Sequence, residues 1–97
     1  MNDDLFTEMR GSWVVVRSNM SGVWSGRFGG ATEDGRSVLL HEAVRAWSWE
    51  GALSCSELAI TGPGDGSTLA IGVHAVVVTG VDEMILQTNT ARERFER

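Results

Sequence analysis

The segment from Trp13 to Phe28 constrains the fold most, because it contains two strand-like runs separated by a cluster of turn-forming residues. The first run, Trp13 to Arg17, is dominated by valine. In the second run, Val23 to Phe28, alternation places Trp24 and Phe28 on the same face. The residues between the runs are Ser, Asn, Met, Ser and Gly, a composition typical of a turn. This pattern predicts a β-hairpin and, with it, an antiparallel sheet.

Three further strands are predicted beyond this hairpin. A long strand over Ser37 to Trp49 is expected to bend or bulge between Glu42 and Arg45. Thr68 to Val73 and Ala75 to Gln87 have the β-branched content of two more strands.

Two Ser/Thr-x-x-Glu sequences predict helix starts, because a hydroxyl at the N-cap and a Glu three residues later form a capping box. Ser54 to Glu57 is followed by an apolar stretch and then by Gly62-Pro63, which is a stop signal. Thr90 to Glu93 predicts a second brief helix near the end of the chain. The expected fold class is therefore α+β, a small antiparallel β-sheet domain with one or two short helices.

With 97 residues, the chain can form one hydrophobic core but not two. We expect a single domain over residues 1–97, with a tail at 1–10, a core at 11–88 and a short C-terminal helix at 89–97. Folding at this size removes only about 60–65% of the surface that the unfolded chain exposes. Self-association would add burial, so an oligomer is expected.

The chain carries 13 acidic and 8 basic residues, and every basic residue is Arg. The resulting net charge of −5 argues against a nucleic acid polymer as partner. Arg makes planar, bidentate contacts with phosphate, so a site for a small anion would depend on geometry. No apolar stretch approaches the roughly 20 residues that cross a membrane, and residues 1–10 lack the features of a signal peptide. A soluble intracellular protein with no membrane partner is expected.

Few residues offer catalytic chemistry. His41 and His74 lack the paired His-x-Thr or His-x-Ser sequences of two-histidine phosphoesterases. Cys55, the single cysteine, is interpreted as a core residue, and together with the two histidines it makes an incomplete zinc ligand set. The glycine-rich loop at 62–68 lacks the lysine of a phosphate-binding loop and follows a helix instead of a strand. We therefore expect no catalytic residue, no metal and no cofactor.

Ligand binding is better supported at the predicted hairpin turn. Arg17 borders this turn, where Ser18 and Asn19 place a hydroxyl and an amide beside the guanidinium. Such a set can hold an anion. The alternative is an exposed Arg at the end of a strand.

A second candidate lies on the long predicted strand, where Arg45, Trp47 and Trp49 alternate on one face. A cation beside flat aromatic rings suits a purine linked to phosphate, since base stacking on an aromatic side chain contributes about 1–3 kcal/mol. The alternative is that the tryptophans pack in the core or in a subunit interface.

Several of these sequences together resemble one protein family. The chain is similar to the first type of Thoeris anti-defence protein, a phage family of signal-sequestering sponges. The likeness covers about three quarters of the chain, from roughly Trp13 to Gln87, and is strongest around Arg45-x-Trp47-x-Trp49 and the helix entry from Gly51 to Ala59. The similar sequences are Val16-Arg17-Ser18-Asn19-Met20-Ser21-Gly22-Val23-Trp24-Ser25-Gly26, Ser37-Val38-Leu39-Leu40, Ala43-Val44-Arg45-Ala46-Trp47-Ser48-Trp49 and Gly51-Ala52-Leu53-Ser54-Cys55-Ser56-Glu57-Leu58-Ala59.

The resemblance implies a non-catalytic protein of the host cytoplasm that traps cyclic nucleotide immune signals. These are glycocyclic ADP-ribose isomers and, in some members, cyclic di- or trinucleotides. It also implies self-assembly as a homodimer or hexamer. Arg17 and Arg45 would contact phosphate, and Trp47 would form a packing or stacking wall. Thr90 and Arg92 are added as ligand-binding candidates from charge and position alone.

Two other classes of function stay open at this point. One is an enzyme that degrades the same messenger with His41 or His74. The other is a structural or peptide-binding β module whose tryptophans only pack subunits together.

Overall fold

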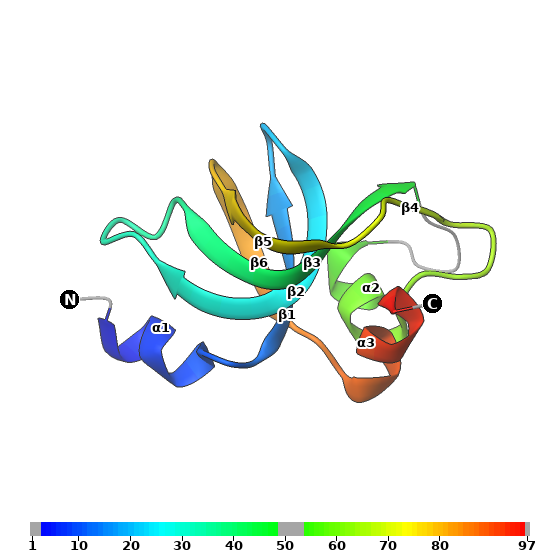
Figure 1. The fold of residues 1–97 in the computed structure, drawn as a ribbon. Helices are drawn as coiled ribbons and strands as arrows, with labels where there is room; N and C mark the ends of the chain where they lie inside the picture. Colours follow the sequence, from blue (N-terminus) through cyan, green and yellow to red (C-terminus); the bar gives the residue numbers. More distant parts are fainter. Residues whose placement is uncertain (1–2, 49–53, 97) are drawn as a thin grey trace.

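The computed structural model describes residues 3–48 and 54–96, and within them it shows an α+β fold, as predicted. Two runs of three strands are separated and flanked by helices along the chain, and Figure 1 shows a curved sheet with helices at both ends. None of the helices in the described residues has the length and apolar composition needed to cross a membrane. The elements are α1 (Asp3–Met9), β1 (Trp13–Ser18), β2 (Gly22–Ala31), β3 (Val38–Ser48), α2 (Cys55–Thr61), β4 (Thr68–Leu69), β5 (Val73–Val78), β6 (Val81–Leu86) and α3 (Asn89–Phe95).

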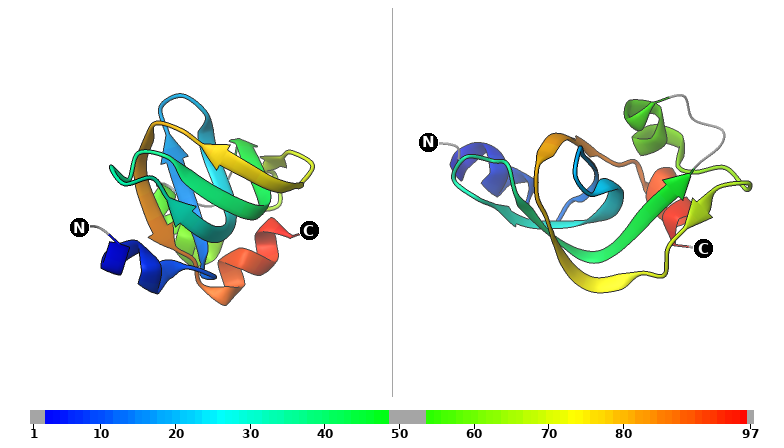
Figure 2. Two further views of the ribbon diagram at one scale, coloured as in Figure 1. Left: turned by 60° about the vertical axis from the view of Figure 1, so that its left-hand side comes forward. Right: turned by 90° about the horizontal axis from the view of Figure 1, so that it is seen from above.

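The strands form one antiparallel sheet in the order β4-β3-β2-β1-β6, and β5 pairs with β3 next to β4. β5 and β6 lie at opposite edges of this sheet, yet only Thr79 and Gly80 connect them. The sheet therefore curls until its edges meet at this connection, as Figure 2 shows. Gly80 permits the sharp turn, because its φ of 65° lies in the left-handed region. The result is a partly closed barrel.

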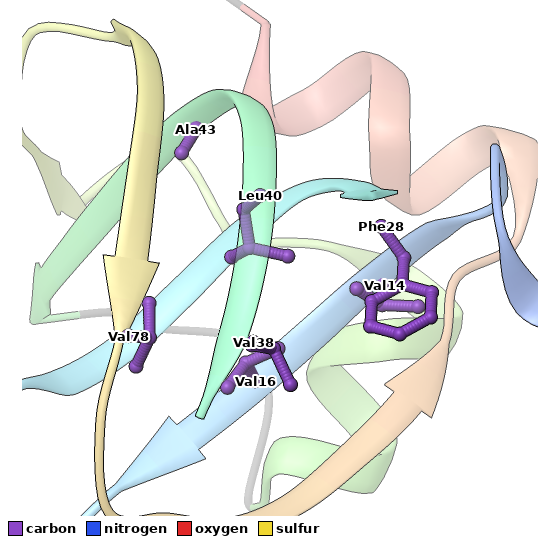
Figure 3. Close-up of a cluster of buried hydrophobic side chains, with 7 residues drawn as sticks. All are labelled: Val14, Val16, Phe28, Val38, Leu40, Ala43 and Val78. Carbon is purple, nitrogen blue, oxygen red and sulfur yellow. The ribbon is translucent and has the colours of Figure 1, made fainter. Parts of the chain in front are cut away.

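An inner cluster of buried apolar side chains fills the concave side of this barrel. Strands β1, β2, β3 and β5 contribute to it, as Figure 3 shows. Phe6 and Met9 of α1 pack against the cluster, and the ring centroids of Phe6 and Phe28 are 6.0 Å apart. Part of the segment expected to be a tail, residues 1–10, is thus a helix that contacts the barrel, because its two large apolar side chains meet the core. The cluster consists of Val14, Val16, Phe28, Val38, Leu40, Ala43 and Val78.

An outer cluster lies on the opposite face of β1 and β2, under α2 and α3. Val15 belongs to it, whereas its neighbours Val14 and Val16 belong to the inner cluster. β1 is therefore buried on both faces, which explains its unbroken run of valines. The outer cluster consists of Val15, Val23, Ala46, Cys55, Leu58, Ala59 and Phe95. The prediction that Cys55 is a core residue is confirmed.

The predicted bulge in the long strand is confirmed. Glu42 has a φ of 51°, and the β2–β3 register shifts between the pairs Ser25–Val44 and Arg27–His41. One extra residue of β3 is accommodated at this point.

The prediction for residues 68–87 is wrong in detail. Within Thr68 to Val73, only the first two residues form β4 and a loop follows, whereas Val73 already begins β5. The predicted strand Ala75 to Gln87 is divided between β5 and β6. Because Val76 to Val78 and Val81 share the same β-branched character, the single Gly80 gives the only break in the pattern.

The two predicted capping boxes have different outcomes. The Ser54 hydroxyl accepts a hydrogen bond from the backbone N–H of Glu57, so this N-cap is confirmed. The second prediction is wrong by two residues, because Thr88 is the N-cap of α3 and accepts from the backbone N–H of Ala91. Thr88 is favoured because this start buries Ala91 and Phe95, which lie on one face of the helix.

Candidate functional site

A groove of about 870 Å³ lies on the outer side of the barrel. We call it the outer groove. Its walls come from the start of β1, the middle of β2 and β3, the β4–β5 loop and α3. A groove of this size falls in the range of small-molecule and cofactor sites, about 300–1,000 Å³.

Arg92 of α3 and Trp13 of β1 form one wall of this groove. The guanidinium carbon of Arg92 lies 4.4 Å from the centroid of the Trp13 ring, in the geometry of a cation–π contact. Burial of Ala91 and Phe95 fixes the rotation of α3 and so directs the intervening Arg92 toward β1. Arg92 is thus a cation held over an aromatic ring on the wall of the groove.

The hydrogen bonding of Arg92 is incomplete. Its terminal nitrogen lies 3.6 Å from a carboxylate oxygen of Glu96, one helical turn away. Its Nε is buried and has no hydrogen-bond partner within the described structure. A buried donor without a partner is unfavourable, so an acceptor that reached this Nε after a shift of the Arg92 side chain would gain a bond that the described residues do not supply.

A histidine and a carboxylate border the opposite wall. His74 of β5 lies 3.7 Å from Glu42 at the β3 bulge, and both side chains are largely exposed. At the groove floor, the hydroxyl of Ser25 accepts a hydrogen bond from the side-chain amide of Gln87. Because positive and negative groups both line the groove, it suits a ligand with a flat ring, acceptors and hydroxyl donors better than a bare polyanion.

Arg17 lies outside the outer groove, near the end of β1. Its Nε is 3.3 Å from a carboxylate oxygen of Glu83 on β6, and about half of its side chain is exposed. The carboxylate of Asp82 accepts a hydrogen bond from the nearby Asn19 amide at 3.3 Å. Both of these ligand-binding candidates therefore have acidic partners in the protein itself.

Ser18 has a structural role in the hairpin. Its hydroxyl donates to the backbone carbonyl of Thr79 and accepts from the backbone N–H groups of Met20 and Ser21, each at 3.1 Å. A hydroxyl has one donor and two acceptor positions, and all three are used here. The hydroxyl group predicted to meet an anion is thus occupied by the backbone.

Arg45 and Arg17 lie on opposite faces of the sheet. Arg17 pairs with Val23, which belongs to the outer cluster, whereas Arg45 pairs with Trp24, which packs against the inner cluster. The guanidinium of Arg45 lies 5.8 Å from the centroid of the Trp24 ring. Paired residues share a face of the sheet, so the two arginines of one chain do not converge on one ligand.

Thr90 and Arg92 are likewise separated. Thr90 lines a smaller hollow of about 440 Å³ between α2 and α3, together with Thr61 and Arg94. Arg92 faces the outer groove instead. The side chain of Trp47 and the whole of Trp49 lie outside the described residues, so the predicted stacking wall stays a prediction.

The sequence interpretation missed the part that Trp13 plays in the site, and left its environment open. Alternation along β1 puts Trp13 on the same face as Val15, which is a signal for an outward-facing ring. That this ring meets Arg92 depends on where α3 packs, and no local pattern encodes that position.

Within the described residues, no group of three or more His, Cys, Asp and Glu side chains is arranged to hold a metal ion. The Cys55 thiol has its pKa raised by burial, with the nearby Glu83 carboxylate acting in the same direction and Arg17 opposing them. A raised pKa keeps this thiol protonated and weakly nucleophilic at neutral pH.

The fold and the outer groove define a class of protein: a small α+β domain with a curled antiparallel sheet and a ligand-sized groove on its outer side. The chain belongs to the family described as a domain of unknown function (DUF6948), whose model matches residues 11–95. The matched region contains all six strands of the sheet together with α2 and α3, and it begins after α1. No curated protein matches the chain in sequence.

Proposed function

We propose that this protein binds a cyclic nucleotide immune signal in the outer groove and sequesters it without cleaving it. The ligand class is taken from the resemblance to phage Thoeris anti-defence sponges: glycocyclic ADP-ribose isomers, with cyclic di- and trinucleotides as further ligands. In this role, the protein acts in the cytoplasm of an infected host cell and keeps the signal from the defence effector that it activates.

The observation that carries the proposal is Arg92, whose guanidinium lies over the Trp13 ring and whose Nε is buried without a hydrogen-bond partner among the described residues. A phosphate or carbonyl oxygen of a nucleotide would accept from the guanidinium. The groove is also large enough for a base and its ribose. These are interactions of recognition and require no nucleophile or general base.

Sequestration demands high affinity, because the sponge must compete with the receptor. A dissociation constant of about 1 nM corresponds to about −12 kcal/mol. Hydrogen bonds to a charged group contribute about 1.5–3 kcal/mol each, and a stacked base adds about 1–3 kcal/mol. A cyclic ligand loses little conformational freedom on binding, so more of this interaction energy appears as affinity.

The proposal includes self-assembly as a homodimer or a hexamer. Arg17 and Arg45 lie on opposite faces of one chain, so both can contact one ligand only when they come from different subunits. Otherwise they belong to separate sites. Assembly therefore decides whether these two arginines act together.

The first experiment is calorimetry with glycocyclic ADP-ribose isomers, cyclic di- and trinucleotides, and linear ADP-ribose as a control for ring closure. The bound ligand is then released by heating the complex, and its mass is measured by mass spectrometry. Tight binding followed by recovery of intact ligand supports the sponge. Conversion to a linear product supports instead an enzyme that uses His41 or His74. Absence of binding to the whole panel supports a structural or peptide-binding module.

A second experiment separates the candidate sites. Arg17→Ala and Arg45→Ala are compared with the double variant after each has been shown to keep the wild-type oligomeric state. Losses of binding free energy that add indicate independent sites, whereas non-additive losses indicate a shared ligand between subunits. If the double variant binds every ligand as tightly as the wild type does, neither arginine belongs to the binding site.

A further inference from the structure

β5 has an apolar face toward solvent where an antiparallel strand ordinarily carries polar residues. Val76 and Val78 point inward and contact or belong to the inner cluster. On the other face, Val77 is 61% exposed, and Val73, where the strand begins, is 42% exposed. Ile71, in the loop just before the strand, is 93% exposed. Together these residues form an apolar patch that the described chain leaves in water.

β5 is also an edge strand. Within the described residues it is hydrogen-bonded to β3 alone, so the N–H and C=O groups along its other side are available for a further strand. It contains neither Pro nor Gly, so the edge is neither interrupted nor bulged by its own sequence.

The other sheet edges are protected in ways that β5 is not. β6 carries the acidic residues Asp82 and Glu83, and charged side chains on an edge discourage pairing with another chain. β4 is only two residues long. Among the edge strands of the described sheet, β5 alone combines a length of 6 residues with mainly apolar side chains and no Asp, Glu, Lys or Arg.

The distribution of charge favours contact between two copies at this strand. The whole chain has a net charge of −5, so copies repel one another over most of their surface. Residues 66–81 contain no Asp, Glu, Lys or Arg, and β5 lies in the middle of them. Two negatively charged chains therefore meet here with the least repulsion.

We propose that β5 pairs antiparallel with β5 of a second copy of this chain, extending the sheet across a two-fold axis. An antiparallel pair of identical strands satisfies the two-fold symmetry of a homodimer, because each copy presents the same edge to the other. Six residues span about 20 Å at about 3.4 Å per residue, which is half of the 40 Å long axis of the protein. This proposal identifies the strand that mediates the self-assembly included in the proposed function, and it rests on that assembly.

The proposed interface adjoins the outer groove. Ile71, Val73 and His74 line the groove and also lie in or next to β5. A second copy on β5 would therefore lie at the rim of the groove and narrow its opening, as a ligand trap requires.

The test compares the mass of the full chain in solution with that of two lysine variants, without any ligand. Val77→Lys places a charge on the proposed interface, and Leu86→Lys places the same charge on β6, where Leu86 is 55% exposed. Both lysines reach water in an isolated subunit, so neither is expected to disturb folding. We expect the wild type and Leu86→Lys to have an even multiple of the 10.5 kDa subunit mass. In Val77→Lys the dissociation constant of the dimer should rise by about 100-fold or more, since two unpaired charges would be forced together.

Hydrogen exchange of the wild type gives a second measurement that needs no variant. Amides of β5 should be protected at high protein concentration and exchange faster on dilution, whereas those of β2 should be unaffected. A wild type that is monomeric at about 100 µM overturns the proposal. The proposal is also overturned if the Val77→Lys variant keeps the assembly mass of the wild type, or if only Leu86→Lys lowers that mass. Because ligand binding is measured separately by calorimetry, these failures are distinguishable from failure of the nucleotide site.

Discussion

The hydroxyl of Ser18 donates a hydrogen bond to the backbone carbonyl of Thr79, and so joins the β1–β2 hairpin to the connection between β5 and β6. Both edges of the curled sheet meet at this bond. It closes the barrel, and it is made by a residue that the sequence placed in a turn and proposed as a ligand-binding candidate.

Ser18→Ala should lower the free energy of unfolding by about 1–3 kcal/mol, because the partly buried hydroxyl group bonds to the Thr79 carbonyl and to two backbone N–H groups, which all lose this partner. Urea denaturation monitored by circular dichroism measures the change. Ser56→Ala is the matched control, since Ser56 is exposed on α2 and its loss should change stability by less than about 0.5 kcal/mol. Equal effects of the two substitutions would contradict the role of Ser18.

Thr88→Ala should destabilise the protein by about 1 kcal/mol, through loss of the N-cap of α3. Thr90→Ala should change the free energy of unfolding by less than about 0.5 kcal/mol, since Thr90 is exposed inside the helix. The same denaturation assay compares the two. A larger effect at Thr90 would place the helix start two residues later than the structure does.

Gly62→Ala should be more destabilising than Gly11→Ala, although both glycines have a positive φ, of 77° and 83°. A Cβ at Gly62 would lie 2.8 Å from Cβ of Arg94 and 3.0 Å from Cα of Ala91, whereas a Cβ at Gly11 meets nothing within 4 Å. Backbone strain alone costs about 1–2 kcal/mol, and the steric overlap at Gly62 adds about 1–3 kcal/mol. Thermal melting of the two variants measures the difference, and equal melting temperatures would refute the close packing of α2 on α3.

Arg92→Ala should weaken binding of the cyclic nucleotide by about 10- to 100-fold, corresponding to the loss of a charge-assisted contact of about 1.5–3 kcal/mol. Arg94→Ala is the control on the same helix, because Arg94 lines the smaller hollow instead of the outer groove. Isothermal calorimetry measures both. If Arg94→Ala weakens binding and Arg92→Ala does not, the ligand occupies the hollow between α2 and α3.

The stability difference between the wild type and Asp34→Asn should depend on pH. The backbone N–H of Arg36 and the hydroxyl of Thr32 donate to the Asp34 carboxylate and hold its pKa below the usual 3.8. Because folding favours the charged form, this stabilisation is present above pH 3.8 and is lost as the pH falls through the folded pKa. Denaturation curves at a series of pH values should therefore converge for the two proteins in acid. A difference that grows on acidification would contradict the assigned hydrogen bonds.

Local patterns predicted the parts of the fold that local physics determines. The hairpin around residues 18–22 follows from a run of valines and a turn sequence, and the Ser54 cap follows from a capping box. The division of β5 from β6 was missed because valines lie on both sides of Gly80, so the hydrophobic pattern continues across the turn.

The candidate site was harder to predict, because it depends on register and on helix packing. Arg17 and Arg45 both appeared suitable for a phosphate, yet strand pairing places them on opposite faces. Arg92 was selected from its charge and position alone, and its contact with Trp13 arises only when α3 packs beside β1. Sequence spacing does not encode such long-range contacts.

The central position of β1 also determines the order in which this protein can fold during synthesis. Val15 pairs with Ser25 soon after the hairpin is made, but its other partner, Ile85, belongs to the last strand of the chain. Until that strand has left the ribosome, one side of β1 has no native partner, and the apolar surface that α3 covers stays accessible to chaperones and to other nascent chains. A chain truncated before residue 81 should therefore aggregate instead of forming a smaller version of the same barrel.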